Sequence, residues 1–291
     1  MVTSKVIPTK LCAIKGALSG KVYQVMAMQI SKVRAEAPKL VETYTQVGRM
    51  LTSKGIKAAT DKAAVEVYID HSGSTEMGRN KLYTRPLPEY DGLSEMARVN
   101  SLAFAGGLFF DDDGNVPTYL FDTGVTPLGD TGLGNYEHVI DQHRNYRFGG
   151  TSYMAVLRHV IEQAGFAGVD LGTNGLFTRP SVKATLEYPK YILVVTDGEP
   201  DYDNTRDIEQ LLIKMSQLPI FVQFVGVGEH EFTFLEKVDK LKGGLIDNVG
   251  FFDAKNPKAA TKQGFLELML SEFASSYYPG ARKLGLVTSK A

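Results

Sequence analysis

The sequence has little cysteine and no marked excess of either charge. Cys12 is its one cysteine, so no internal disulfide can form, and we expect this residue to pack as a small apolar side chain. The formal net charge at pH 7 is −1. Because proteins that bind nucleic acid usually carry a clear basic excess, this balance argues against a nucleic-acid partner.

Long apolar runs are also missing. No stretch approaches the roughly 20 apolar residues that a membrane-spanning helix needs. Residues 1–8 lack the continuous apolar run of a secretory signal, so we expect a cytoplasmic protein without a membrane span. The length of 291 residues suffices for one large domain with an appendage or for two small domains.

The N-terminal region has the spacing of helices. Apolar residues recur at helical intervals over residues 22–51, and Gly55 then supplies a helix stop. Pro38 lies inside this run and should break or kink it, so two helices agree with the pattern as well as one. We therefore predict an N-terminal helical extension over residues 1–60, with residues 1–20 left unassigned.

From residue 61 onward, short apolar runs alternate with helical patterns. Strands are predicted at 64–69, 116–121, 191–196, 220–227 and 249–252. Helices are predicted at 92–108, 136–142, 152–164, 208–215, 232–241 and 264–277. This alternation predicts an α/β, doubly wound domain with a mainly parallel sheet buried on both faces. We place it at residues 61–280, with a C-terminal tail at 281–291.

Polar side chains gather in three loops, at the points where such a sheet binds ligands. Residues 70–74 read Asp-His-Ser-Gly-Ser, residues 149–153 read Gly-Gly-Thr-Ser-Tyr, and residues 196–200 read Thr-Asp-Gly-Glu-Pro. Together they offer five hard oxygen donors: Asp70, Ser72, Ser74, Thr151 and Asp197. Such donors with an unfilled position suit Mg²⁺, Mn²⁺ or Ca²⁺ rather than zinc. Since only two donors are charged, the cation would keep positive charge that a partner carboxylate can meet.

The spacing Asp70-x-Ser72-x-Ser74, with Thr151 in a Gly-Gly-Thr loop and Asp197 in a Thr-Asp-Gly loop, resembles the metal-ion-dependent adhesion site of von Willebrand factor A (vWA) domains. The resemblance implies a Rossmann-like sheet wrapped by helices. It implies a divalent cation, Mg²⁺ before Mn²⁺ or Ca²⁺, with Asp70, Ser72 and Ser74 as direct ligands. Thr151 and Asp197 would bind directly or through water. It also implies a protein partner that offers an Asp or Glu carboxylate.

Further motifs resemble the vWA domain at the C-terminus of TerF-type tellurium-resistance proteins. They lie at residues 110–114, 120–124, 135–137, 219–226, 234–237 and 247–253, within a similarity that runs from about 62 to 278. This implies a tellurium-resistance, stress-response or phage-related setting. His71 departs from the family, where many members have a small or apolar residue. We predict that His71, Glu199 and Asp201 form a rim that contacts the partner.

The same residues are also compatible with other functions. A metal-dependent phosphoester hydrolase would use the same cation as a Lewis acid, but His71 is the one candidate general base beside the site in the sequence. A docking component of a larger assembly would suit the N-terminal extension. We predict a binding module rather than an enzyme.

Asp111, Asp112 and Asp113 are interpreted as a solvated turn, because the glycine that follows them is misplaced for an EF-hand.

Overall fold

The structure is a computed structural model, and most of the predicted α/β domain is described by it. The described residues are 49, 53, 62–75, 82–83, 85–87, 93–132, 149–167 and 184–288. The predicted helix at 136–142 lies outside them, and so does the N-terminal extension except for Arg49 and Ser53.

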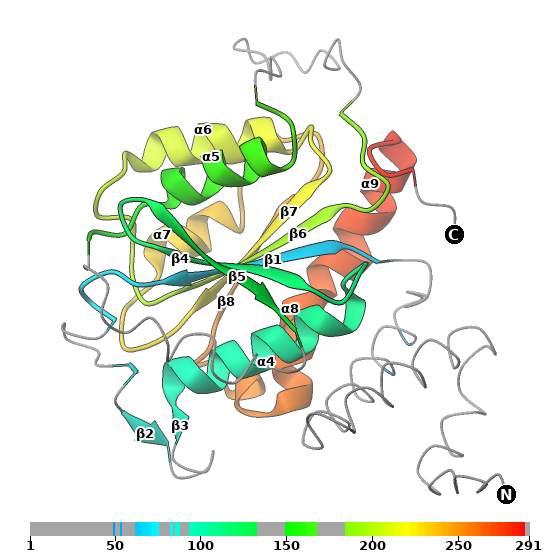
Figure 1. Cartoon of the computed structure of the whole chain (residues 1–291). Helices are drawn as coiled ribbons and strands as arrows, with labels where there is room; N and C mark the ends of the chain where they lie inside the picture. Colours follow the sequence, from blue (N-terminus) through cyan, green and yellow to red (C-terminus); the bar gives the residue numbers. More distant parts are fainter. Residues whose placement is uncertain are drawn as a thin grey trace, which may run out of the picture.

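A six-stranded sheet forms the centre of the domain (Figure 1). Its strands are β1 (Ala64–Asp70), β4 (Val116–Phe121), β5 (Val125–Thr131), β6 (Lys190–Thr196), β7 (Ile220–Gly226) and β8 (Val249–Asp253). They lie in the order β5-β4-β1-β6-β7-β8, and all neighbours pair in parallel except β4 and β5. A separate two-stranded sheet pairs β2 (Pro86–Leu87) with β3 (Leu93–Ser94).

The central strands are buried on both faces, as their continuous apolar sequences predict. β7 is buried along its whole length, and β1 and β6 are buried except at their first residues. β-branched and aromatic side chains fill these strands because they pack well on a pleated surface. The predicted α/β class with a mainly parallel, doubly wound sheet is therefore confirmed.

Helices cover both faces of the sheet (Figure 1). One face carries α4 (Glu95–Phe110), α8 (Lys262–Glu272) and α9 (Tyr278–Leu284), and the other carries α5 (Tyr153–Gln163), α6 (Thr205–Met215) and α7 (Thr233–Val238). Each face has its own apolar core: Phe110, Phe221 and Phe273 belong to the first, and Tyr153 and Phe224 to the second. The sheet thus separates two cores and leaves its strand ends to the loops.

Polar side chains cap the N-termini of four helices. Ser94, Ser152, Asn204 and Thr261 each accept a hydrogen bond from a backbone N–H in the first turn of α4, α5, α6 and α8. These caps satisfy amide groups that have no partner within the helix. Gly285 ends α9 with a φ of 70°, in the left-handed region where glycine has no steric penalty.

Several elements of the described residues were missing from the sequence prediction, including β2, β3 and the 3-10 helix Pro257–Ala260. β5 pairs antiparallel with β4 at the sheet edge, where its exposed residues hide the apolar pattern of a buried strand. The predicted helix at 264–277 contains a π-helical segment, Phe273–Tyr277, and α9 then continues the chain. The predicted boundary at residue 280 stays a prediction, although α9 crosses it and Leu286 and Val287 are buried in the core.

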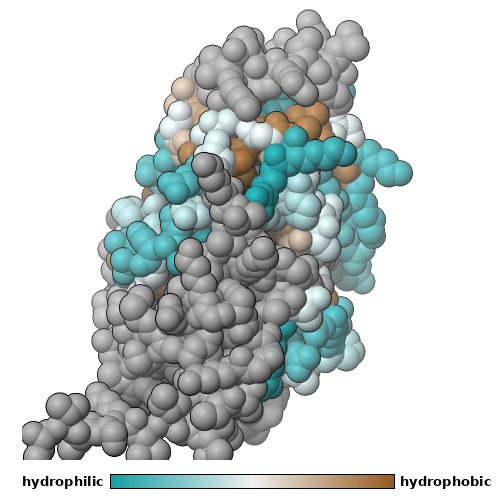
Figure 2. Space-filling view, turned by 90° about the vertical axis from the view of Figure 1, so that its right-hand side faces the viewer, coloured by the Kyte–Doolittle hydropathy of each residue, from teal (hydrophilic) through white to brown (hydrophobic). Residues whose placement is uncertain are grey.

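The surface of the described part is largely polar. Figure 2 shows one face whose coloured atoms are mostly hydrophilic, with small hydrophobic areas toward its top. Among the described residues, the large hydrophobic side chains that are exposed are Tyr202 and Leu245. Within that same set, no helix combines the length and the apolar character that crossing a membrane requires.

Candidate metal site

Two carboxylates of the predicted site lie at neighbouring strand ends. Asp70 is the last residue of β1, and Asp197 directly follows β6, the parallel neighbour of β1. Both are fully buried. The carboxyl ends of parallel strands meet at one edge of the sheet, and this is why residues far apart in sequence come together here.

Hydrogen bonds join the first and third loops directly. The Ser74 hydroxyl donates to Oδ1 of Asp197 at 2.8 Å, and the Ser72 and Ser74 hydroxyls lie 3.0 Å apart. The Ser72 N–H donates to Oδ1 of Asp70 at 2.9 Å, and the Thr196 hydroxyl donates to its Oδ2 at 2.6 Å. Four of the five predicted ligands therefore form one cluster of oxygens.

Thr151, the fifth predicted ligand, lies in the loop that packs against the first. The Gly73 N–H donates to the Gly149 carbonyl at 3.1 Å, which joins the two loops. Thr151 is 3% exposed, and its N–H donates to Oδ1 of Asp201 at 2.5 Å. The described hydrogen bonds fix the backbone of Thr151 and leave its hydroxyl for another partner.

The carboxylates of Asp70 and Asp197 favour the binding of a positive charge between them. Burial raises the pKa of Asp70 to about 7, and the neighbouring Asp197 carboxylate adds to the rise. Hydrogen bonds from Thr196 and Ser72 oppose it. Two carboxylates this close repel each other, and a divalent cation between them would relieve the repulsion. The donor set, two carboxylates and three hydroxyls, fits a hard divalent cation.

Two side chains that the sequence did not single out hold these loops. The carboxylate of Asp122 accepts the N–H of Gly149 at 3.0 Å, and the Asp122 carbonyl accepts the N–H of Ser152 at 3.0 Å. The hydroxyl of Tyr153 donates to the carbonyl of Gly198, in the third loop. The motif at 120–124 contained Asp122, but its contact with Gly149 depends on the tertiary fold.

The three predicted rim residues lie close to the cluster but differ in exposure. His71 is 4% exposed, and its ring lies edge-on to that of Tyr83 at 6.3 Å. Glu199 accepts the N–H of Phe234 at 2.9 Å, while Asp201 is exposed and holds Thr151. Their role in contacting a partner stays a prediction.

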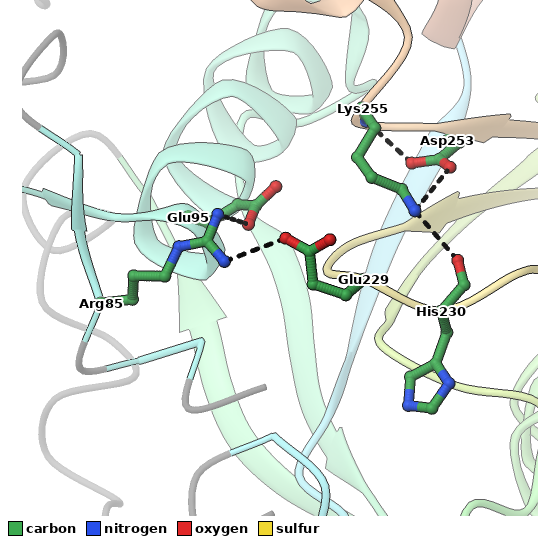
Figure 3. A network of polar contacts seen from close by, with 6 residues as sticks. All are labelled: Arg85, Glu95, Glu229, His230, Asp253 and Lys255. Carbon is green, nitrogen blue, oxygen red and sulfur yellow. Dashed lines mark hydrogen bonds and ion pairs between the residues drawn. The ribbon is translucent and has the colours of Figure 1, made fainter. Parts of the chain in front are cut away.

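A network of charged side chains lies beyond the same strand ends (Figure 3). Arg85 reaches Glu95 at 3.5 Å and Glu229 at 3.2 Å. Lys255 lies 3.7 Å from Asp253, the last residue of β8, and donates to the His230 carbonyl at 3.1 Å. The Arg85–Glu229 and Lys255–Asp253 pairs are solvent-accessible and contribute little to stability, so their charges can contact a partner at small cost to the fold, whereas Glu95 is buried.

The acidic turn after α4 differs from the solvated turn that we predicted. Asp113 is exposed, but Asp111 is 1% exposed and its carboxylate accepts the N–H groups of Val65 and Gly114 at 2.9 and 2.7 Å. Oxygens of Asp111, Asp112 and Asp113 lie within 4.8 Å of one another. Because backbone donors already occupy Asp111, this carboxylate acts as a structural link between β1 and the turn.

Comparison with known proteins identifies the family of the domain. Residues 62–287 match the family model of the vWA domain found in the TerF C-terminus. The protein YcbR of Bacillus subtilis (strain 168) is 25% identical over 169 residues, which cover 56% of this chain and 61% of YcbR. The chain therefore spans less than two thirds of this relative.

Two solved structures resemble part of the chain. The von Willebrand factor type A protein from Catenulispora acidiphila is 18% identical with a TM-score of 0.43, over 74% of this chain and 42% of that chain. Manganese-loaded Plasmodium vivax TRAP protein is 14% identical with a TM-score of 0.48, over 74% of each chain. The assignment therefore depends on the sequence match, which covers most of the described domain: the chain belongs to the family of von Willebrand factor A domains found at the C-terminus of TerF.

Proposed function

We propose that the chain is a metal-dependent protein-binding module that captures a partner carboxylate through a divalent cation, with Mg²⁺ as the first candidate. The family as a whole consists of interaction modules, many of which depend on a divalent cation. Asp70, Ser72, Ser74, Thr151 and Asp197 would hold the ion. The observation that carries the proposal is the hydrogen-bonded cluster of Ser72, Ser74 and Asp197 beside the buried carboxylate of Asp70.

The chemistry of capture follows from the charge of the donors. Two carboxylates balance the formal charge of a divalent cation, but the neutral hydroxyl donors offset little of its electric field. An open coordination position would therefore attract an anionic oxygen. The cation supplies this attraction when bound. The chain's own residues orient the donors, since backbone contacts hold all three loops together.

An exposed aromatic ring next to the site supports a protein partner. Tyr202 is 69% exposed, and its N–H donates to the Thr151 carbonyl at 3.4 Å. Exposed tyrosines are frequent anchors of protein interfaces. We propose that Tyr202 contacts the same partner as the cation does.

Catalysis has less support than capture. His71, the candidate general base in the sequence, is 4% exposed, so a substrate would have to reach a nearly closed imidazole. The proposed setting in tellurium resistance, stress response or a phage-related process depends on the family alone, and the proposed cytoplasmic location stays a prediction. A docking role within a larger assembly is the second candidate.

Calorimetric titration with Mg²⁺ tests the metal site. We expect a dissociation constant on the order of 10⁻⁴ to 10⁻³ M, by analogy with low-charge cation sites. Asp70→Ala should abolish binding, because it removes one of two charged donors. The matched control Asp113→Ala changes an exposed carboxylate outside the cluster and should leave binding unchanged. No heat of binding at about 10 mM Mg²⁺ would remove the proposal.

A second experiment separates capture from catalysis. Once a partner is identified by pull-down with and without a chelator, Thr151→Ala and Tyr202→Ala should both weaken its binding. Only Thr151→Ala should also weaken Mg²⁺ binding. Steady metal-dependent hydrolysis of a simple phosphoester, lost in both Asp70→Ala and His71→Ala, would instead favour an enzyme.

A further inference from the structure

A second group of acidic side chains lies at the opposite end of the sheet from the candidate metal site. Asp247 precedes β8, Glu272 is the last residue of α8, and Asp239 is the C-cap of α7. Because β8 runs parallel to β6 and β7, its beginning lies at the far end of the sheet from Asp70 and Asp197. The group is therefore separate from the metal loops.

A buried amide oxygen without a partner points into this group. Gln223, in the middle of β7, is 1% exposed, and its Nε2 donates to the Phe224 carbonyl at 3.2 Å. Because Nε2 faces the Phe224 carbonyl, Oε1 of the same amide points away from that carbonyl. Within the described part of the chain, Oε1 has no hydrogen-bond partner. A buried acceptor without a hydrogen bond destabilises the fold, so a ligand that supplies a positive charge or a donor there has a physical reason to bind.

Gly250 leaves the space between these oxygens open. It pairs with Gln223 across β7 and β8. A Cβ atom placed on Gly250 would lie 2.7 Å from Oε1 of Gln223 and 2.7 Å from Oε2 of Glu272. The two oxygens therefore face the same point, which any residue other than glycine would fill with carbon.

The side-chain charges that act on Glu272 are those of the carboxylates Asp247 and Asp239. Asp247 and Glu272 lie close enough for each carboxyl group to shift the pKa of the other. Burial, together with the charges of Asp247 and Asp239, raises the pKa of Glu272 to about 8. Among the described residues, no ion pair joins a lysine or arginine to Asp247 or Glu272.

From this arrangement we infer that Gln223, Asp247 and Glu272 form a second cation site, which takes a calcium ion. Carboxylates combined with a side-chain amide carbonyl form a typical oxygen set for Ca²⁺, whose flexible geometry accepts donors from separate elements. The ion offsets the negative charge of the two carboxylates and satisfies Oε1 of Gln223. The acidic turn at Asp111 has no such feature, because backbone N–H groups occupy its buried carboxylate.

Calorimetric titration of the full chain carrying Asp70→Ala with CaCl₂ tests this site by itself. We expect one Ca²⁺ per chain, because Asp70→Ala removes only the other site. Adding Glu272→Gln should weaken binding at least about tenfold, since it removes a charged ligand. The matched control Glu267→Gln makes the same change on the same helix, at a residue that pairs with Lys258, and should leave Ca²⁺ affinity unchanged.

A second variant keeps the test decisive if Glu272→Gln does not fold. Gly250→Ala retains every ligand but fills the space between them, so it should also abolish Ca²⁺ binding while circular dichroism shows a folded chain. The inference is overturned if the Asp70→Ala chain binds no Ca²⁺ at about 10 mM, or if Glu272→Gln and Gly250→Ala bind it as well as their parent. Failure of the unsubstituted chain to bind Mg²⁺ at the Asp70 site would contradict the proposed function and leave this inference untouched.

Discussion

At the scale of single residues, the domain buries several charged groups and gives each a specific partner. Glu66 is 2% exposed, and its carboxylate accepts hydrogen bonds from Lys190 and from the Tyr68 hydroxyl. The Tyr68 hydroxyl also lies 2.8 Å from Nδ1 of His159. An unpaired buried charge would cost several kcal/mol, so such groups persist only where a neighbour compensates them. Asp70 is the group that a cation would compensate.

Asp111 makes the stability of the fold depend on pH. Burial raises the pKa of Asp111 to about 7, against the opposing hydrogen bonds from Val65 and Gly114. The folded chain therefore binds more protons than the unfolded chain between pH of about 4 and about 7. This contribution to stability is fully present below pH of about 4 and is lost as the pH rises through about 7. Asp111→Asn should reduce the pH-dependent loss in the free energy of unfolding by at least about 1 kcal/mol.

Urea unfolding at pH of about 5 and about 8 measures this difference. Asp113→Asn is the matched control, because it changes an exposed carboxylate in the same turn and should keep the pH dependence of the parent. An Asp111→Asn chain whose free energy of unfolding varies with pH as much as that of the parent would show that Asp111 titrates normally.

At the scale of elements, the loop between β6 and α6 holds the start of α5. Asp203 accepts the Ser152 hydroxyl at 2.9 Å and the Met154 N–H at 2.9 Å, and Asp201 accepts the Thr151 N–H. A carboxylate at a helix N-terminus also meets the positive end of the helix dipole. The third loop thus positions Thr151, although it contributes only Asp197 to the predicted ligands.

Asp203→Ala should therefore weaken both the fold and the metal site. We expect a loss of about 1–2 kcal/mol in the free energy of unfolding, because two hydrogen bonds to the start of α5 disappear. Mg²⁺ affinity should fall severalfold, because Asp203 holds Ser152 and Met154, and Thr151 directly precedes them in the second loop. Chemical denaturation and calorimetry measure the two effects. Asp207→Ala, at an exposed position in the first turn of α6, should change neither, and an equal loss in both variants would contradict the coupling.

At the scale of the whole molecule, binding of a cation should stabilise the folded domain. The three loops that carry the predicted ligands approach one another only in the folded chain, so the unfolded chain has no comparable site. A ligand at about 100 times its dissociation constant adds about 2.7 kcal/mol. For a domain of this size, that corresponds to a rise in Tm of roughly 5–10 °C.

Thermal unfolding with and without Mg²⁺ checks this expectation. The rise in Tm should be absent in Asp197→Ala and present in the control Asp113→Ala. A rise of equal size in Asp197→Ala would place the stabilising ion elsewhere in the chain.

The sequence by itself determined the parallel sheet and the residues of the candidate metal site. Continuous apolar strands such as 191–196 can be buried only between two layers of helices, and carboxylates that follow parallel strands must meet at one sheet edge. These consequences depend on local pattern and on chain direction, which the sequence contains.

Only the tertiary structure decided which polar residues are buried and which elements hold the loops. β5 was missed because an exposed edge strand has no apolar run, and the burial of His71 and Asp111 depends on neighbours far away in the sequence. The unpaired oxygen of Gln223 was equally hidden. Its strand was predicted, but the residues that surround Oε1, among them Gly250 and Glu272, come from β8 and α8 and meet Gln223 only in the folded chain.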